Sequence, residues 1–142
     1  MRHGEDVFVD TGAWIALAVI RDPYHQAAVS QWEMLLENRA RLSTSVPVVI
    51  ETFTFLQRNA NLMVASAWRD SFGSEIPVKV LECRKQDLDE AWSHFQHRKF
   101  HKLSVVDASS FTLMRRHKIR RAFAFDHHFR RCCLGDDREV GT

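Results

Sequence analysis

The chain has 142 residues, a net charge of +2 and 45% hydrophobic residues, which suits a single globular domain with a substantial core. No stretch approaches the roughly 20 apolar residues that span a bilayer. Three cysteines, two of them adjacent, exclude a conventional disulfide framework. We therefore expect a cytoplasmic protein without a membrane segment.

The charge is unevenly distributed along the chain. The net charge is −4 up to His97 and +6 from Arg98 onward. Lys and Arg side chains gain binding free energy when they displace counterions from phosphates, so the basic part suits a polyanionic partner. A solvated helix face gives the same pattern, and the charge alone does not separate the two explanations.

Apolar runs with the periodicity of strands and of helices alternate along the chain. We expect strands at residues 7–9, 41–44, 76–81 and 121–125. We expect helices at residues 12–20, 24–38, 48–57, 62–72, 86–97 and 104–117, with Ser45 and Ser104 as caps. This alternation predicts an α/β fold in which a parallel sheet lies between helices.

The chain shows no internal repeat and no interdomain linker. We expect one domain over residues 1–134 and a polar C-terminal tail over residues 135–142. The tail is expected to be frayed, unless residues 138–140 add a short edge strand.

Four acidic residues interrupt or end apolar runs. Asp10 and Asp126 follow predicted strands, Glu51 lies early in the helix after the second strand, and Asp107 opens the helix before the last strand. Each has a structural explanation of its own. Asp10 can cap a helix, Asp107 can complete a capping motif with Ser104, Glu51 can face solvent, and Asp126 can begin a turn.

Taken together, the four acids predict a metal site. In a parallel sheet, all four positions lie at the carboxyl edge of the strands. Converging carboxylates raise one another's pKa values, and a divalent cation relieves the repulsion. Oxygen-only donors suit Mg²⁺ or Mn²⁺, which activates water and neutralises charge during phosphodiester hydrolysis.

Five motifs, in this order, resemble those of the PIN-domain family, and specifically of the VapC-type ribonuclease toxins of VapBC toxin–antitoxin pairs. They cover nearly the whole chain and are Val9-Asp10-Thr11-Gly12, Asp22-Pro23-Tyr24-His25, Val49-Ile50-Glu51-Thr52, Leu103-Ser104-Val105-Val106-Asp107-Ala108 and Ala124-Phe125-Asp126-His127-His128-Phe129. The resemblance implies a PIN-like three-layer fold, with a central parallel sheet of four to five strands flanked by helices.

The resemblance also implies an activity. This is a Mg²⁺- or Mn²⁺-dependent endoribonuclease that hydrolyses RNA phosphodiester bonds as the toxin of a type II toxin–antitoxin pair. The implied catalytic acids are Asp10, Glu51, Asp107 and Asp126. Asp10 and Asp107 are the expected direct metal ligands, while Asp126 and Glu51 bind a second metal or position the first through water.

Further residues and partners follow from the same resemblance. Thr11 and Ser104 match positions where the family places hydroxyl groups beside the acids. Arg115, Arg116 and Arg130 are the candidates for holding the RNA backbone. The implied partners are the RNA substrate, a cognate antitoxin protein and a second copy of the chain in a homodimer.

Other groups of residues receive a structural interpretation. His94, His97 and His101 share a helical face, but no Cys or acidic partner lies near them in sequence, and we do not expect a zinc site. Cys132 and Cys133 are expected to pack rather than to form a redox centre. The tryptophans are expected to be core and interface residues.

The toxin has one alternative with the same chemistry and two from other classes, and the sequence argues against the latter two. A PIN-domain RNA-processing nuclease without an antitoxin would use the same chemistry. A non-catalytic α/β binding module with an acidic pocket, of the receiver type, needs an Asp after the third strand, but residues 76–81 are followed by Glu82-Cys83. A dehalogenase-type phosphatase needs a second Asp where the chain has Gly12.

Overall fold

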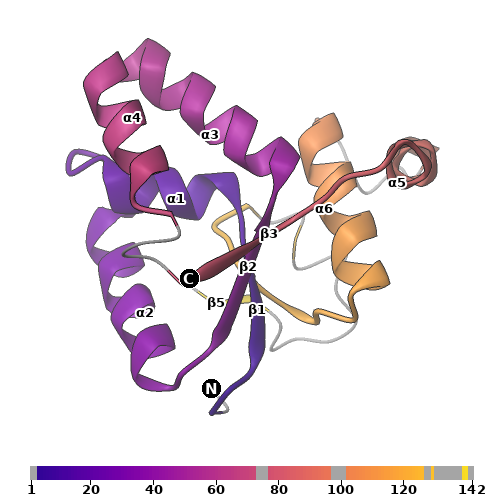
Figure 1. Ribbon diagram of the computed structural model, residues 1–142, viewed down its shortest axis with the longest axis horizontal. Coiled ribbons are helices and arrows are strands. Elements are labelled where there is room, and N and C mark those ends of the chain that lie inside the picture. Colours follow the sequence, from indigo (N-terminus) through magenta and orange to yellow (C-terminus); the bar gives the residue numbers. More distant parts are fainter. Residues whose placement is uncertain (1–2, 73–76, 97–101, 127–128, 130–138, 141–142) are drawn as a thin grey trace.

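The computed structural model describes residues 3–72, 77–96, 102–126, 129 and 139–140, and every structural statement concerns these residues. A parallel sheet forms the centre of the molecule (Figure 1). Its strand order is β3-β2-β1-β4-β5, and each neighbouring pair is parallel. The strands are β1 (Asp6–Val9), β2 (Arg41–Ser45), β3 (Val78–Leu81), β4 (Arg121–Phe123) and β5 (Glu139–Val140).

Helices cover both faces of this sheet. In Figure 1, α1 and α2 lie on one side of the sheet and α5 and α6 on the other, while α3 and α4 form a hairpin beyond the end of β2. The helices are α1 (Thr11–Ala18), α2 (His25–Glu37), α3 (Val46–Asn59), α4 (Leu62–Asp70), α5 (Lys85–Ala91) and α6 (Val105–Arg116), with a 3₁₀ helix, η1 (Trp92–Gln96), after α5. The predicted three-layer α/β fold is confirmed.

The differences from the predicted elements are local. The helix expected over residues 86–97 divides into α5 and η1, and β4 ends at Phe123, before Phe125. Of the two possibilities for the tail, the short strand is present at Glu139–Val140 as β5 beside β4. The domain boundary at residue 134 lies outside the described residues and stays a prediction. None of the described helices is long and apolar enough to cross a bilayer.

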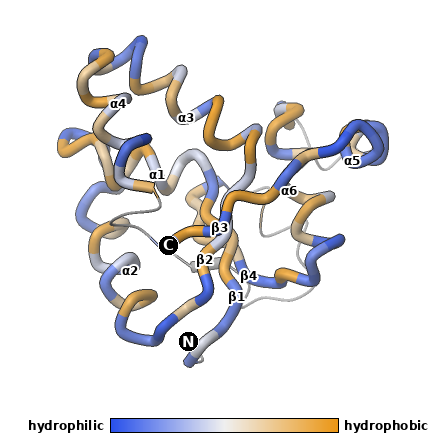
Figure 2. The backbone as a smooth tube through the Cα atoms, viewed as in Figure 1, coloured by the Kyte–Doolittle hydropathy of each residue, from blue (hydrophilic) through white to orange (hydrophobic). Residues whose placement is uncertain are grey.

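The core is built around β1. Val7, Phe8 and Val9 are fully buried, because β1 is paired on both edges and covered on both faces. Figure 2 shows this apolar run at the centre and the hydrophilic residues of α5 at the periphery. A strand that is apolar on both faces can only be a central strand, so its carboxyl end opens at the middle of the sheet edge.

A buried hydrogen-bonded chain fixes the end of β1. The Trp14 indole N–H of α1 donates to the Thr44 hydroxyl of β2 at 3.1 Å, and that hydroxyl donates to the Val9 carbonyl at 2.9 Å. Thr44 is fully buried and Trp14 is 1% exposed. One threonine therefore connects α1, β2 and the residue that precedes Asp10.

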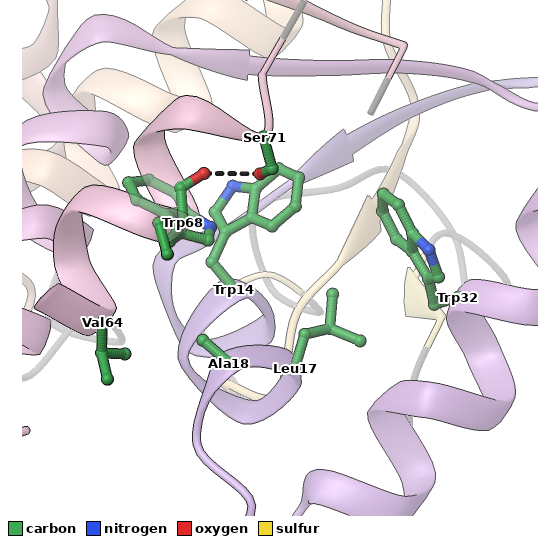
Figure 3. Close-up of a pocket in the computed structure, with 8 residues that line it drawn as sticks. Trp14, Leu17, Ala18, Trp32, Val64, Trp68 and Ser71 are labelled. Carbon is green, nitrogen blue, oxygen red and sulfur yellow. Dashed lines mark hydrogen bonds between the residues drawn. The ribbon is translucent and has the colours of Figure 1, made fainter. Parts of the chain in front are cut away.

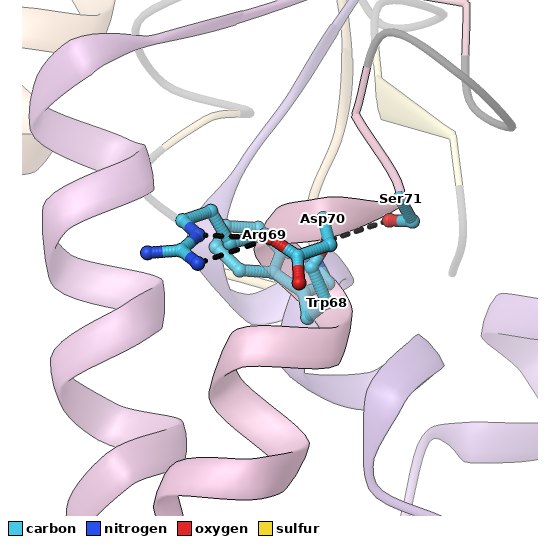
Figure 4. A network of polar contacts seen from close by, with 4 residues as sticks. All are labelled: Trp68, Arg69, Asp70 and Ser71. Carbon is cyan, nitrogen blue, oxygen red and sulfur yellow. Dashed lines mark hydrogen bonds and ion pairs between the residues drawn. The ribbon is translucent and has the colours of Figure 1, made fainter.

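An aromatic cluster extends from Trp14 toward α2 and α4. The centroid of the Trp14 ring lies 5.7 Å from that of Trp32 and 5.9 Å from that of Trp68. These side chains line a pocket of about 500 Å³ between α1, α2 and α4 (Figure 3). Beside it, the Ser71 hydroxyl donates to the Trp68 carbonyl at 2.5 Å and ends α4, next to the exposed ion pair of Arg69 with Asp70 (Figure 4).

We predict that Thr44→Val destabilises the protein by about 1–3 kcal/mol, because it leaves the buried Trp14 N–H without an acceptor. Urea unfolding followed by tryptophan fluorescence measures this change. The control is Thr54→Val, which removes a hydroxyl bonded to the Ile50 carbonyl within α3. We expect that change to stay within about 0.5 kcal/mol. Equal losses in the two variants would contradict a special role for Thr44.

Candidate active site

Asp10 sits where two strands and a helix meet. Its N–H donates to the Phe123 carbonyl of β4 at 3.0 Å, and its carbonyl accepts from the N–H groups of Ala13 and Trp14 at the start of α1, each at 3.1 Å. The residue is 4% exposed. Because its backbone is held from both sides, the carboxylate has little freedom to move out to solvent.

Asp107 and Glu51 lie near the starts of two capped helices, Asp107 in the first turn of α6 and Glu51 in the second turn of α3. The Ser104 hydroxyl accepts from the Asp107 N–H at 3.0 Å, which starts α6 and places Asp107 in its first turn with 9% exposure. The Ser45 hydroxyl accepts from the Val48 N–H at 3.3 Å and starts α3, where Glu51 is half-buried. Ser104 thus acts on Asp107 through the backbone, as an N-cap.

Electrostatic coupling shows that these acids converge on Asp10. Burial raises the pKa of Asp10 well above its ordinary value of 3.8, and the carboxylates of Asp107 and Glu51 raise that pKa further. The N–H groups of Thr11 and Gly12 act in the opposite direction. The Asp10 side chain makes no capping hydrogen bond to α1, so capping does not explain its burial.

Asp126 lies beyond the end of β4. It is half-buried, and its carbonyl accepts from the Phe129 N–H at 3.2 Å. Asp107 and Glu51 are thus each coupled to Asp10, and Asp126 lies three residues past the end of β4 at the same edge of the sheet.

The donor set fits a hydrated divalent cation. Asp10 Oδ1 and Thr11 Oγ1 are buried and have no hydrogen-bond partner among the described residues. Among the described residues, the side chains that shift the pKa of Asp10 most are the carboxylates of Asp107 and Glu51. In the described part of the chain, no three His, Cys, Asp or Glu side chains are arranged to enclose a metal ion. Mg²⁺ typically keeps several waters and takes one or two carboxylates, whereas a structural Zn²⁺ site is closed.

The comparisons with known proteins decide the family. The model of the PIN domain matches residues 7–133. The chain belongs to the PIN-domain family. The 23S rRNA-specific endonuclease VapC20 of Mycobacterium tuberculosis is 35% identical over 127 residues, which are 87% of this chain and 91% of that protein.

Solved structures of PIN-domain proteins agree. The crystal structure of M. tuberculosis VapC20, titled a sarcin-ricin loop cleaving toxin, has a TM-score of 0.80 at 30% identity, over 93% of this chain and 98% of that one. VapBC2 from Rickettsia felis, bound to a promoter DNA fragment, has a TM-score of 0.67 at 11% identity, over 94% and 96%. The second likeness concerns the fold alone.

The basic residues proposed to hold RNA occupy different environments. Arg115 of this PIN domain is exposed, whereas Arg116 is partly buried. Its Nη2 lies 3.1 Å from Asp87 Oδ2 and donates to the Glu82 carbonyl at 3.3 Å. Asp87 is 2% exposed and also accepts from the Arg84 N–H at 2.9 Å. Arg130 lies outside the described residues.

Of the three histidines considered for a zinc site, the structure describes His94. His94 is buried, packs edge-on against Phe111 with ring centroids 5.5 Å apart, and has Nε2 3.5 Å from the Thr112 hydroxyl. His97, His101, Cys132 and Cys133 lie outside the described residues. Two features that sequence reasoning missed are the Asp87–Arg116 pair and a groove of about 720 Å³, lined by Ile50, Glu51 and Val106 among others.

We predict that Asp10→Asn stabilises the metal-free protein near neutral pH by about 1–3 kcal/mol, because it removes a poorly solvated charge. A carboxyl whose pKa is raised on folding loses stability as the pH rises above its unfolded-state pKa. The difference between variant and wild type should therefore vanish near pH 3.8, the ordinary carboxyl value. Urea unfolding in EDTA at both pH values measures it. A variant that is less stable than wild type near neutral pH would show that the Asp10 charge is compensated.

Proposed function

We propose that this chain is a Mg²⁺- or Mn²⁺-dependent endoribonuclease and the toxin of a toxin–antitoxin pair, with 23S rRNA as its substrate. The observation that carries the proposal is the cluster of buried Asp10 and Asp107 with half-buried Glu51 at the carboxyl edge of a PIN fold. The substrate is inferred from the 35% identity with an endonuclease named for 23S rRNA. No observation favours the RNA-processing nuclease or the non-catalytic module over this function.

Each acid receives a role from its position. Asp10 and Asp107, the two buried carboxylates, are proposed to hold the cation, because neither is well solvated without one. Glu51 and Asp126 are more exposed, and we assign them to positioning through water or to a second cation. A bound Mg²⁺ or Mn²⁺ would supply charge neutralisation on the phosphodiester and a lowered pKa for the attacking water.

The backbone contributes to the same site. The first turns of α3 and α6 start at this edge, and helix N-termini attract anions through their free N–H groups. The hydroxyls of Ser45 and Ser104 fix where those helices begin. Thr11 stays a proposed supporting residue, and its buried hydroxyl without a partner next to Asp10 supports that role.

We predict that Asp107→Asn lowers cleavage of RNA by about 100-fold or more, because several kcal/mol of transition-state stabilisation depend on the bound cation. The assay compares ribosomes, a hairpin with the sarcin-ricin sequence and an unrelated RNA, with Mg²⁺ or Mn²⁺ and with EDTA. The control is Asp89→Asn, which removes an exposed acid paired with Lys85 at 3.0 Å.

Two results would count against this proposal in different ways. If Asp107→Asn, purified in the same way, cleaves as fast as wild type, the acidic cluster is not the catalytic site. If wild type cleaves all RNAs equally, the nuclease activity stands and the 23S rRNA specificity fails. A toxin role is tested separately, since growth arrest on expression should be relieved only when the cognate antitoxin is produced with it.

Homodimerisation is part of the proposal, and exposed apolar side chains support it. Ile50 is 62% exposed, Phe55 39% and Leu88 36%, and all three line the groove that contains Glu51. Apolar patches of this kind commonly mark protein interfaces. We place the contact between two copies of the chain on this face of α3 and α5.

We predict that Leu88→Glu weakens the dimer by at least about tenfold in dissociation constant, because a charge in an interface core loses its hydration. Light scattering after size exclusion, over a dilution series, measures the change. Met63→Glu is the control, since Met63 is 81% exposed on α4 and does not line this groove. A wild-type protein that is monomeric at all concentrations would refute the homodimer.

A further inference from the structure

An aromatic pair stands beside the acidic edge and has no part in the chemistry described so far. Tyr24 and Phe125 stack with their ring centroids 4.6 Å apart and their planes at 15°. Phe125 directly precedes Asp126 and also meets Phe123 of β4 edge-on at 6.0 Å. Tyr24 directly precedes α2 and is 54% exposed. The pair thus connects the segment before α2 with the segment that carries Asp126.

Local hydrogen bonds fix the position of Tyr24. The Asp22 carboxylate accepts from the Tyr24 N–H at 2.9 Å, and the Asp22 carbonyl accepts from the His25 N–H at 2.9 Å. His25 Nδ1 lies 2.7 Å from the Ala16 carbonyl and donates to it, which ties this segment to the end of α1. The ring is therefore oriented before any ligand arrives, and binding orders little further.

The two faces of the Tyr24 ring differ. One face is covered by Phe125 in a nearly parallel stack, and the 54% exposure of the residue leaves the other available. A planar ligand on that face would extend the stack by one layer. Arg21 is exposed three residues earlier and forms no ion pair with any described acid, so a cation suitable for phosphate lies in the same segment.

We propose that Tyr24 is a stacking platform for an unpaired base of the RNA bound at the acids, with Arg21 contacting a neighbouring phosphate. The proposal rests on the proposed function, since it assigns a substrate contact to a nuclease. RNA-binding proteins recognise unpaired bases largely by stacking on aromatic side chains, and each such contact contributes substantially to affinity. The platform would position the strand relative to Asp126.

Kinetics provide the first test. We expect Tyr24→Leu to lower kcat/KM on a cleaved RNA by about tenfold, mainly through KM, because leucine keeps apolar bulk without an aromatic face. Tyr24→Phe should stay within about twofold of wild type, because it keeps the ring. Met63→Ala, an exposed apolar residue on α4, is the control and should change nothing. A Tyr24→Leu protein that cleaves with the wild-type KM would overturn the proposal.

The second test does not depend on cleavage. Tyr24 is the only tyrosine of the chain, so 3-fluorotyrosine labelling gives a single fluorine resonance. In an Asp107→Asn background we expect single-stranded RNA of about ten nucleotides to shift this resonance, and Tyr24→Leu to weaken binding of the same RNA. An unchanged resonance under saturating RNA would overturn the platform.

The two tests also separate this proposal from the proposed function. If wild type cleaves RNA and the resonance stays in place, the nuclease stands and the platform fails. If the resonance shifts and Tyr24→Leu weakens binding while wild type cleaves nothing, the platform stands and the nuclease fails. Absence of any RNA binding overturns the platform directly.

Discussion

The burial of the Asp10 carboxylate is the constraint on which the rest of the structure depends. A charge that is 4% exposed and faces two further carboxylates destabilises a fold unless something compensates it. Asp10 does not move away from those carboxylates, because its backbone is hydrogen-bonded to β4 and to α1. The fully buried strand β1 and the Trp14–Thr44–Val9 hydrogen bonds hold this junction in place. The PIN domain therefore keeps a strained electrostatic site on a rigid base, where a cation can relieve the repulsion.

The parallel topology explains how distant residues reach this site. Every strand of a parallel sheet ends at the same edge, and the segments that follow start there. Ser45 and Ser104 lie at this edge as the N-caps of α3 and α6. Each cap sets the helical phase of the acid that follows it. The position of a carboxylate thus depends on a hydroxyl group three to six residues earlier in the chain.

Most of the fold could be predicted from the sequence because its signals are local. The apolar run before Asp10, the capping serines and the periodicity of α6 are all contained in short segments. The sequence also predicted that other acids approach Asp10, and Asp107 and Glu51 do raise its pKa, whereas the catalytic roles of the four acids stay predictions. The stacking of Tyr24 on Phe125 joins residues about a hundred positions apart, and no local pattern encodes it.

The basic excess of the C-terminal part of the chain is not all free positive charge. Arg116 belongs to the basic run, but its guanidinium is paired with Asp87, so it contributes little free positive charge. Arg115 and Arg116 also lie in the last turn of α6, about 12 Å along the helix axis from Asp107, at a rise of about 1.5 Å per residue. They therefore lie away from the acids and can contact only RNA that extends along α6. Under the proposed function, a bound cation and the helix N-termini would attract phosphate at the acids themselves. The proposed platform of Tyr24 with Arg21 would add a contact that does not depend on the metal.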